Sequence, residues 1–389
     1  MARLIVVGDT FLGGEFSRGQ EVSGDTFMSE ELRERLLGAD AVICNLEAPI
    51  TDSTSPIQIP GKHRFRAPAK AISALEWSGI GVATLANNHM MDFGVQGLKD
   101  TLRALDSIGV RYTGAGEDGT EARQPALIQC GNLRVAVLAY TRIDAPYRRQ
   151  VPYAGVGSAG VARLVCKDVQ GDISQALDQA DVVVLSLHWK NSHLRLPHPV
   201  DLYVARELID AGATIVFGHH PHIVRGIERY KSGLIAYSLG NFFFPNHRML
   251  HNNVVSYGEA GQLHGSPGLN RLGLALAIDF CSSGVLEYEA LPVVQERHKP
   301  FVSFGSVVMQ RRFARQLEAW SAPLLETDYR NHYRLYSSLL RGSPRGIISS
   351  ILGIPTAIRL HLEQRGIEGV LRRVNEVIRG YVRLWMKDW

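Results

Sequence analysis

Between residue 3 and about residue 222, short apolar runs alternate with segments whose apolar residues recur at helical spacing. Continuous apolar runs of this length are typical of strands that are buried on both faces. The predicted strands cover residues 4–7, 41–44, 81–85, 134–140, 181–187 and 214–217. The predicted helices cover residues 29–37, 68–78, 95–108, 167–179 and 199–211. This alternation predicts an α/β protein.

Further strands are predicted outside this alternation. Residues 126–130 and 133–138 turn at Gly131-Asn132 and form a predicted hairpin. A second antiparallel group is predicted at residues 223–228, 234–237, 272–280 and 285–294. Together the two groups predict a two-sheet sandwich flanked by helices. Two long irregular segments, 146–161 and 245–270, are candidate rims of a substrate cleft.

Composition and cysteine usage indicate a globular protein in a reducing compartment. Hydrophobic residues make up 45% and charged residues 21% of the 389 residues, which excludes a disordered chain. The four cysteines are far apart and form neither a disulfide framework nor a CxxC pair. The first apolar run is too short for a secretory signal, and no stretch approaches the roughly 18 apolar residues of a membrane span. We therefore expect a cytoplasmic protein.

Charge and periodicity set the C-terminal segment apart. Residues 297–389 contain 16 lysines and arginines against 7 aspartates and glutamates, whereas the rest of the chain contains 26 against 31. Apolar residues from Ile367 to Trp385 recur at helical spacing, with arginines on the other side. We predict a domain over residues 1–298 and a basic helical extension over residues 299–389. Its last helix would dock on the body, pair in a homo-oligomer, or make peripheral contact with a membrane.

Nucleic-acid binding is not expected, because the basic excess is confined to this extension. The extension contains no recognised nucleic-acid-binding motif and no aromatic stacking platform.

Polar side chains that can bind a metal follow several of the predicted strands. They are Asp9, Glu47, Asn88, His188, His220 and His222. Parallel strands bring their carboxyl ends to one edge of a sheet, so these donors would share one crevice. Three imidazoles, two carboxylates and one amide suit Zn, Mn, Fe or Co. Each residue alone has a plainer explanation, since Asp9 or Asn45 can cap a turn and a single histidine is more often a satisfied polar group.

Several short motifs, taken in order, resemble those of one known family. They are Gly8-Asp9, Asn45-Leu46-Glu47-Ala48-Pro49, Phe65-Arg66-Ala67-Pro68, Ala86-Asn87-Asn88-His89 with Asp92-Phe93-Gly94, Thr113-Gly114-Ala115-Gly116, His188-Trp189, Gly218-His219-His220-Pro221-His222 and Tyr237-Ser238-Leu239-Gly240-Asn241-Phe242. As a set, over residues 3–295, they look like the CapA/PgsA family of bacterial capsule and poly-γ-glutamate synthesis. That family belongs to the calcineurin-like metallophosphatase superfamily. Residues 300–389 lie outside the resemblance.

This resemblance implies a four-layer α/β/β/α metallophosphatase-like sandwich that holds one or two divalent transition-metal ions. It implies that the six donors named above are metal ligands and that His89 is the general acid. Asn45 and Asn241 would contact ligand side chains and orient them.

The sequence departs from the family pattern at two places. Phosphoesterases of the superfamily carry a histidine two residues after the first aspartate, where this chain has Phe11, so one metal would lose a ligand. Many family members read His-Trp-Gly-x-Glu-Tyr where this chain has His188-Trp189-Lys190-Asn191-Ser192-His193. The second change replaces a carboxylate with Ser192, so the substrate can differ from that of the family.

Three functions remain open from the sequence. The first is a metal-dependent hydrolase that acts on an anionic or peptide/polymer substrate in capsule, polyglutamate or peptide natural-product biosynthesis, with Arg66, Lys190 and Arg225 as candidate anion contacts. The second is a metal-dependent epimerase of a peptide or amino-acid Cα, in which Asp9 and one of His89 or His219 are the bases. The third is a non-catalytic component of a polymer-synthesis complex, in which the extension serves for docking.

Overall fold

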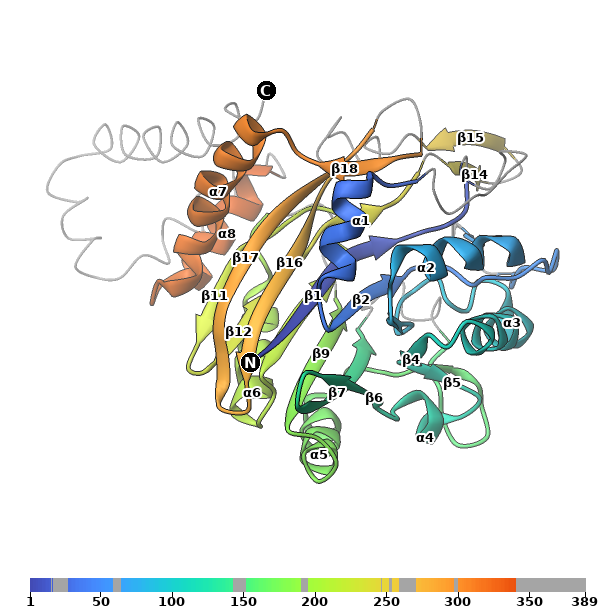
Figure 1. Ribbon diagram of the computed structural model, residues 1–389, viewed down its shortest axis with the longest axis horizontal. Coiled ribbons are helices and arrows are strands. Elements are labelled where there is room, and N and C mark those ends of the chain that lie inside the picture. Colours follow the sequence, from blue (N-terminus) through green and yellow to red (C-terminus); the bar gives the residue numbers. More distant parts are fainter. Residues whose placement is uncertain are drawn as a thin grey trace, which may run out of the picture.

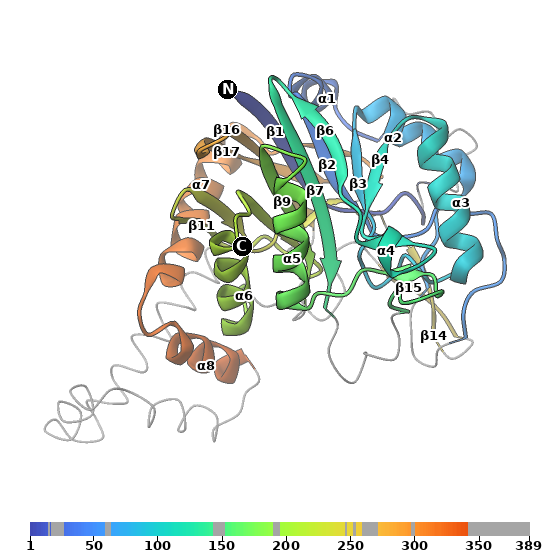
Figure 2. The ribbon, with the colours of Figure 1, turned by 90° about the horizontal axis from the view of Figure 1, so that it is seen from below.

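The computed structural model describes residues 1–14, 16, 27–58, 64–142, 152–189, 195–245, 247–251, 254–258, 271–296 and 300–340. Two mixed β-sheets pack face to face, and helices cover their outer faces (Figures 1 and 2). The predicted α/β class is confirmed.

The first sheet joins a parallel half to an antiparallel half. Its order is β18-β17-β16-β1-β2-β3-β4, and β13 also pairs with β1. Strands β1 to β4 are parallel, whereas β16 to β18 are antiparallel to their neighbours. The strands are β1 (Ala2–Thr10), β2 (Ala41–Leu46), β3 (Val82–Thr84), β4 (Arg111–Thr113), β13 (Asn241–Phe243), β16 (Leu272–Cys281), β17 (Gly284–Gln295) and β18 (Val302–Phe304).

The second sheet has four parallel strands at its centre and an antiparallel strand at each edge. Its order is β11-β12-β10-β9-β7-β6. The strands are β6 (Ala126–Cys130), β7 (Leu133–Thr141), β9 (Val182–His188), β10 (Ile215–His219), β11 (Ile227–Tyr230) and β12 (Gly233–Ala236). Two small ribbons pair β5 (Ala115–Gly116) with β8 (Gly160–Val161) and β14 (His247–His251) with β15 (Val254–Gly258).

The helices are divided between the two outer faces and one edge. The described helices are α1 (Glu30–Leu37), η3 (Ala69–Ala71), α2 (Ile72–Ser78), α3 (Gly94–Ser107), α4 (Gly119–Ala122), α5 (Cys166–Leu177), α6 (Pro199–Asp210), α7 (Val307–Ser321), η6 (Ala322–Leu325) and α8 (Tyr329–Leu340). Helices α1, α2 and α3 share a core with the first sheet, and α5 and α6 share one with the second (Figure 2).

Alternation of side chains along the central strands produces this layering. In β1, Ile5 and Val7 face the helices, whereas Leu4 and Val6 face the second sheet. Successive side chains of a strand point to opposite faces, so strands with apolar residues at every position need a layer on each side. The continuous apolar runs in the sequence therefore reflect burial on both faces.

Local signals in the sequence fix the helix starts. Ser29 caps α1, because its Oγ accepts the N–H of Leu32 at 3.3 Å. His198 caps α6 and Asp201 completes a capping box with it, while Pro199 occupies the first turn. These two helices begin within one residue of the predicted positions.

Three predictions about the later strands need correction. β12 is parallel to β10 as well as antiparallel to β11, so it belongs to the centre of the second sheet rather than to an antiparallel meander. The strand predicted from residue 223 begins at Ile227, because residues 223–226 complete a loop. The segment 245–270, predicted to be irregular, contains the β14–β15 ribbon.

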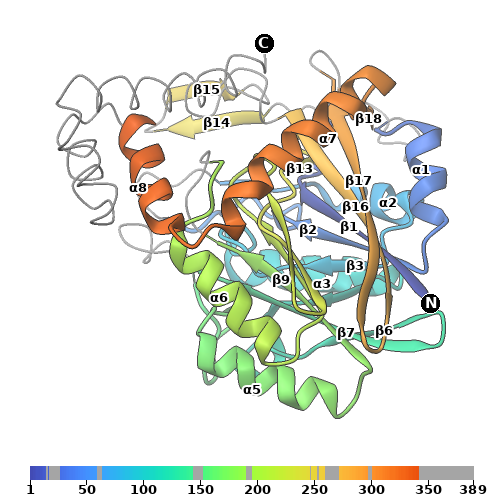
Figure 3. The same cartoon turned by 90° about the vertical axis from the view of Figure 1, so that its left-hand side faces the viewer.

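The described residues after 298 pack on the body. β18 pairs with β17, and α7 places Phe313, Leu317 and Trp320 in the core between the sheets (Figure 3). The predicted boundary at residue 298 stays a prediction, and the apolar stripe from Ile367 to Trp385 lies outside the described residues. Within the described ranges, no helix has the length and apolar character needed to span a membrane.

Candidate metal centre

The centre forms where the parallel halves of the two sheets meet at the carboxyl ends of their strands. Asp9 lies near the end of β1, beside Asn45 of β2 and Asn241 of β13. His188 ends β9 and lies beside His219 at the end of β10. The predicted set of strand-end donors is therefore gathered at one place.

Close approach of two backbones puts Asp9 in position. A Cβ atom on Gly8 would lie 2.0 Å from the carbonyl oxygen of Gly240, so only glycine fits there. Gly240 itself has a φ of 67°. The backbone N–H of Asp9 donates to the Gly240 carbonyl at 2.9 Å. This contact holds the end of β1 against β13.

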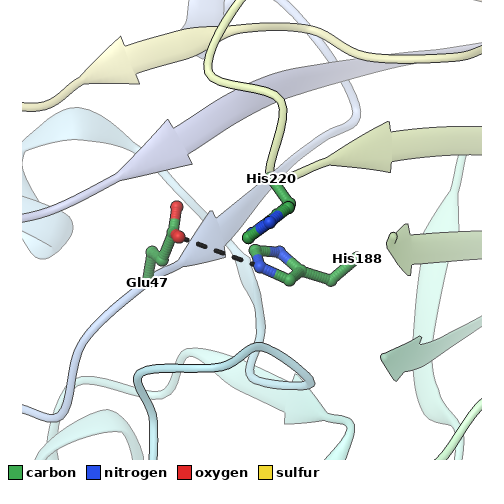
Figure 4. A group of neighbouring side chains, drawn as sticks. All are labelled: Glu47, His188 and His220. Carbon is green, nitrogen blue, oxygen red and sulfur yellow. Dashed lines mark ion pairs between the residues drawn. The ribbon is translucent and has the colours of Figure 1, made fainter. Parts of the chain in front are cut away.

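Two groups of possible metal ligands share one carboxylate. Glu47, His188 and His220 form the first group, and Asp9, Glu47 and His222 form the second, with ligand atoms within 4.8 Å of one another in each. Figure 4 shows the Glu47, His188 and His220 side chains pointing toward one another from different elements. Glu47 is therefore the residue that could contribute to a cation site in either group.

The carboxylate of Glu47 is buried without a hydrogen-bond donor among the described residues. It is fully buried, and neither carboxylate oxygen accepts a hydrogen bond from a residue that the structure describes. Its Oε1 lies 3.8 Å from His188 Nε2 and 3.7 Å from His222 Nε2. Burial, together with the nearby charge of Asp9, raises the pKa of Glu47 well above its ordinary value. A bound cation would supply the missing stabilisation.

Asp9 has a different environment. Asn45 donates to its Oδ1 at 2.7 Å, and the backbone N–H of His220 donates to its Oδ2 at 3.3 Å. Burial alone would raise its pKa, but hydrogen bonds with His219 and His222 lower the pKa of Asp9 well below its ordinary value. The pKa values of the two carboxyl groups are therefore shifted in opposite directions, that of Asp9 downward and that of Glu47 upward.

His188 and Asn88 occupy the opposite side of the centre. His188 Nε2 lies 2.7 Å from Asn88 Oδ1, and its Nδ1 lies 3.5 Å from Asn45 Nδ2. Burial, with the neighbouring His220, lowers the pKa of His188 well below its ordinary value. A neutral imidazole and an amide oxygen are both competent metal donors.

The loop after β10 carries two further imidazoles on a strained backbone. His220 has a φ of 88° and His222 a φ of 57°, values that L-residues other than glycine rarely adopt. His222 Nδ1 lies 2.9 Å from Asn241 Oδ1 and 3.3 Å from Asp9 Oδ2. Burial lowers and the Asp9 carboxylate raises the pKa of His222, and the net shift is upward. Such strain persists where surrounding contacts over-determine a functional geometry.

His89 is held by the carboxylate of Asp92, to which we assigned no role from the sequence. Its Nδ1 lies 2.7 Å from Oδ2 of the buried Asp92, which also accepts the N–H of Phe65 at 2.8 Å. Asn87 fixes the same loop, because its Oδ1 accepts the N–H groups of His89 and Met90. In the sequence, His89 and Asp92 stand three residues apart within one motif, but nothing there assigned a role to Asp92.

Phe11, two residues after Asp9, belongs to an apolar cluster beside the donor groups. Its ring centroid lies 5.2 Å from those of Phe65 and Phe244. Phe65 also lies 4.2 Å from the His89 ring, and Phe244 lies 5.3 Å from the His222 ring. The donor group of Asp9, Glu47 and His222 therefore borders on an aromatic cluster rather than on a fourth side-chain ligand.

The other predicted site residues lie at varied positions. His219 is fully buried, with Nδ1 3.4 Å from Asp9 Oδ1. Arg66 is exposed, and its Nη1 donates to the Ser53 carbonyl at 2.7 Å. Arg225 is fully buried, a position that does not favour contact with a substrate. Lys190 lies outside the described residues.

Comparison with known families agrees with this gathering of motifs. Residues 3–246 match the model of the family described as bacterial capsule synthesis protein PGA_cap. The chain belongs to this family. The matched residues include all six donors and end before β16.

Several named relatives are similar to the chain. A capsule biosynthesis protein CapA from Bacillus anthracis is 31% identical over 247 residues, which are 62% of this chain and 59% of that protein. A PGA biosynthesis protein CapA from Bacillus subtilis is 31% identical over 240 residues, 61% of this chain and 62% of that protein. The chain thus spans about three fifths of the length of these relatives.

Among solved structures, a hypothetical protein from Thermus thermophilus aligns with 75% of this chain and 98% of its own, at 15% identity and a TM-score of 0.41.

Proposed function

We propose that this chain is a metal-dependent hydrolase that acts on an anionic or peptide/polymer substrate in the synthesis of a capsule, polyglutamate or a related peptide product. The observation that carries the proposal is the position of Glu47, buried, without hydrogen bonds from described residues and common to two groups of donors. The names of two relatives, which concern capsule and PGA biosynthesis, support the choice of pathway.

The donor set fits one or two divalent transition-metal ions. Asn88 would complete the group of Glu47, His188 and His220, because its amide oxygen already lies beside His188 Nε2. The group of Asp9, Glu47 and His222 has three members, since Phe11 contributes no donor. Neutral imidazoles with carboxylate and amide oxygens suit Mn, Zn, Fe or Co. The layers of helices and sheets support a metallophosphatase-like fold as part of this proposal.

The bound ions would polarise a phosphoryl or acyl oxygen of the substrate and activate water. The residues of the chain would supply orientation and proton transfer. Asn45 holds Asp9 and lies beside His188, so it sets the direction of two ligands at once. Asp92 holds His89 by Nδ1 and so fixes the orientation of the imidazole that would protonate the leaving group.

A product screen tests this proposal against its alternatives. Metal-free protein is supplied with Mn²⁺ and offered p-nitrophenyl phosphate, bis(p-nitrophenyl) phosphate and γ-glutamyl-p-nitroanilide. Hydrolysis predicts release of the coloured product, abolished by a chelator and by Asp9→Ala. Solvent deuterium at a Cα of a recovered peptide, with no cleavage, would instead support epimerisation.

A second arm addresses the non-catalytic alternative. Polymer formation is measured in cells that carry either the wild-type chain, Asp9→Ala or His220→Ala. If both variants sustain wild-type polymer levels, the chain acts as a scaffold and the hydrolase proposal fails.

A further inference from the structure

The loop that carries His220 and His222 continues into residues 223–227, and the segment α7–η6 contacts that stretch. This segment lies outside the family match. Residues 223–226 lead from His222 to β11, and the end of α7 packs on this stretch. Figure 3 shows α7 lying along β17 and passing toward α6 and α8. Three contacts connect the two segments.

The first contact is a hydrogen bond at the start of β11. The N–H of Ile227 donates to Ser321 Oγ at 2.9 Å, and that hydroxyl donates to the Leu317 carbonyl at 2.7 Å. Ser321 therefore connects the last turn of α7 to the residue that ends the loop.

The second contact uses a cation. Nη1 of Arg195 donates to the carbonyl of Val224 at 3.1 Å, while its guanidinium lies 4.0 Å from the centre of the Trp320 ring. A guanidinium placed over an indole face is attracted to it. Trp320 is 8% exposed, so it presents a buried, well-defined face to Arg195.

The third contact depends on the absence of a side chain. A Cβ atom on Gly226 would lie 2.6 Å from the carbonyl oxygen of Trp320 and 2.9 Å from Cα of Ser321. Only glycine permits this approach, so residue 226 and the end of α7 are fitted to each other. Val224 and Ile227 join the same apolar core as Phe313, Leu317 and Trp320.

We infer that the end of α7 is a brace that positions the His220–His222 loop for metal binding, with Ser321 and Trp320 as positioning residues. The inference rests on the proposed metal function. The positive φ values of the two histidines need external contacts to persist. The brace supplies such contacts two to five residues beyond His222.

The test compares full-length Ser321→Ala with wild type and with two controls. Ser321→Thr keeps the hydroxyl, and Leu105→Ala weakens the packing of α3 in a different core. Mn²⁺ affinity is measured by titration calorimetry, and thermal stability is measured in parallel. We expect Ser321→Ala to bind Mn²⁺ about tenfold more weakly, as is typical when residues that support metal ligands are removed. Ser321→Thr and Leu105→Ala should bind within about twofold of wild type.

Hydrogen exchange in the metal-free proteins gives a readout that does not depend on metal. The amide of His220 donates to Asp9, and the amide of Arg225 donates to the Ser238 carbonyl. Both should exchange faster in Ser321→Ala than in Leu105→Ala. Wild-type affinity and unchanged exchange in Ser321→Ala, with stability lowered as in Leu105→Ala, would overturn the brace. If wild type binds no Mn²⁺, the metal proposal fails, and the exchange rates alone decide the brace.

Discussion

His222 Nδ1 lies 3.3 Å from Asp9 Oδ2, although His222 follows a strand of the second sheet and Asp9 ends a strand of the first. Each sheet thus supplies only part of the centre, and the apolar core between the sheets sets the distance between the parts. Metal binding and packing of the two sheets should therefore be coupled, since a site absent from the unfolded chain stabilises the fold when occupied.

Replacement of His89 should separate catalysis from metal binding. His89→Ala should keep the wild-type metal content and lower turnover roughly 10²–10⁴-fold, the usual contribution of a positioned proton donor. Metal content is measured by elemental analysis and turnover with the best substrate of the product screen. His332→Ala, which removes a histidine paired with Glu326 far from the centre in sequence, is the control. An equal loss of metal content and turnover in His89→Ala would show that His89 is a metal ligand.

Phe11→His should increase metal occupancy. Among the described residues the group of Asp9, Glu47 and His222 has three members, and Phe11, two residues after Asp9, offers no donor atom. We expect wild type to hold its second ion weakly and Phe11→His to approach two ions per chain at equal Mn²⁺ concentration. Phe11→Leu controls for disruption of the Phe65 and Phe244 contacts. Equal occupancy in wild type and both variants would show that the position is irrelevant to metal binding.

Metal affinity should increase with pH. Burial, with the charge of Asp9, raises the pKa of Glu47, so the metal-free carboxyl keeps its proton above about pH 4.3, where an ordinary glutamate ionises. A cation must displace that proton, so binding releases protons and weakens as the pH falls. Calorimetry in two buffers of different ionisation enthalpy measures the release. Binding that does not weaken as the pH falls toward about 4.3 would contradict a raised pKa of Glu47.

Removal of residues 367–389 should leave the metal centre folded. Those residues lie outside the described part of the chain, and the centre is built from residues before 242. We expect unchanged Mn²⁺ binding but a changed oligomeric mass or changed binding to anionic lipid vesicles. Light scattering and vesicle sedimentation give these two readouts. If the truncated protein loses the metal centre, the tail is part of the core. If its oligomeric mass and its lipid binding are unchanged, the tail has no role in binding a partner.

The sequence predicted the donors because each follows a strand that is apolar on both faces. Asp9, His188 and His220 could be placed in one crevice from strand order alone, without any knowledge of side-chain contacts. The partner of His89 could not be predicted in the same way, because Asp92 follows no strand and its role depends on how the loop folds back. Likewise, nothing in the sequence distinguished a buried Arg225 from an exposed one.

The strand pairing was harder to predict than the strands themselves. β12 pairs with both β10 and β11. Its parallel pairing with β10 joins residues 19 positions apart, and no turn sequence between the strands predicts such a pairing. The contact between α7 and the loop also could not be predicted from the sequence, because the hydrogen bond between Ser321 and Ile227 joins residues 94 positions apart. Long-range contacts of this kind depend on the packed fold.

Glu47→Gln tests the central claim, because one residue is assigned to both groups of donors. A carboxyl group whose pKa is raised on folding contributes stability below the unfolded pKa, about 4.3, and that stability is lost as the pH rises toward the folded value. At pH 7 the metal-free Glu47→Gln protein should therefore be at least as stable as metal-free wild type. The amide introduced by Glu47→Gln is neutral, so it would supply no negative charge to a bound cation.

The decisive measurement is the Tm of both proteins with and without Mn²⁺, together with the number of ions bound, and exposed Glu76→Gln is the matched control. At 100 times its Kd, Mn²⁺ should stabilise wild type and the control by about 2.7 kcal/mol. The account predicts no rise in Tm and no bound ion in Glu47→Gln. A Glu47→Gln protein with the wild-type number of ions and the wild-type rise in Tm would contradict it.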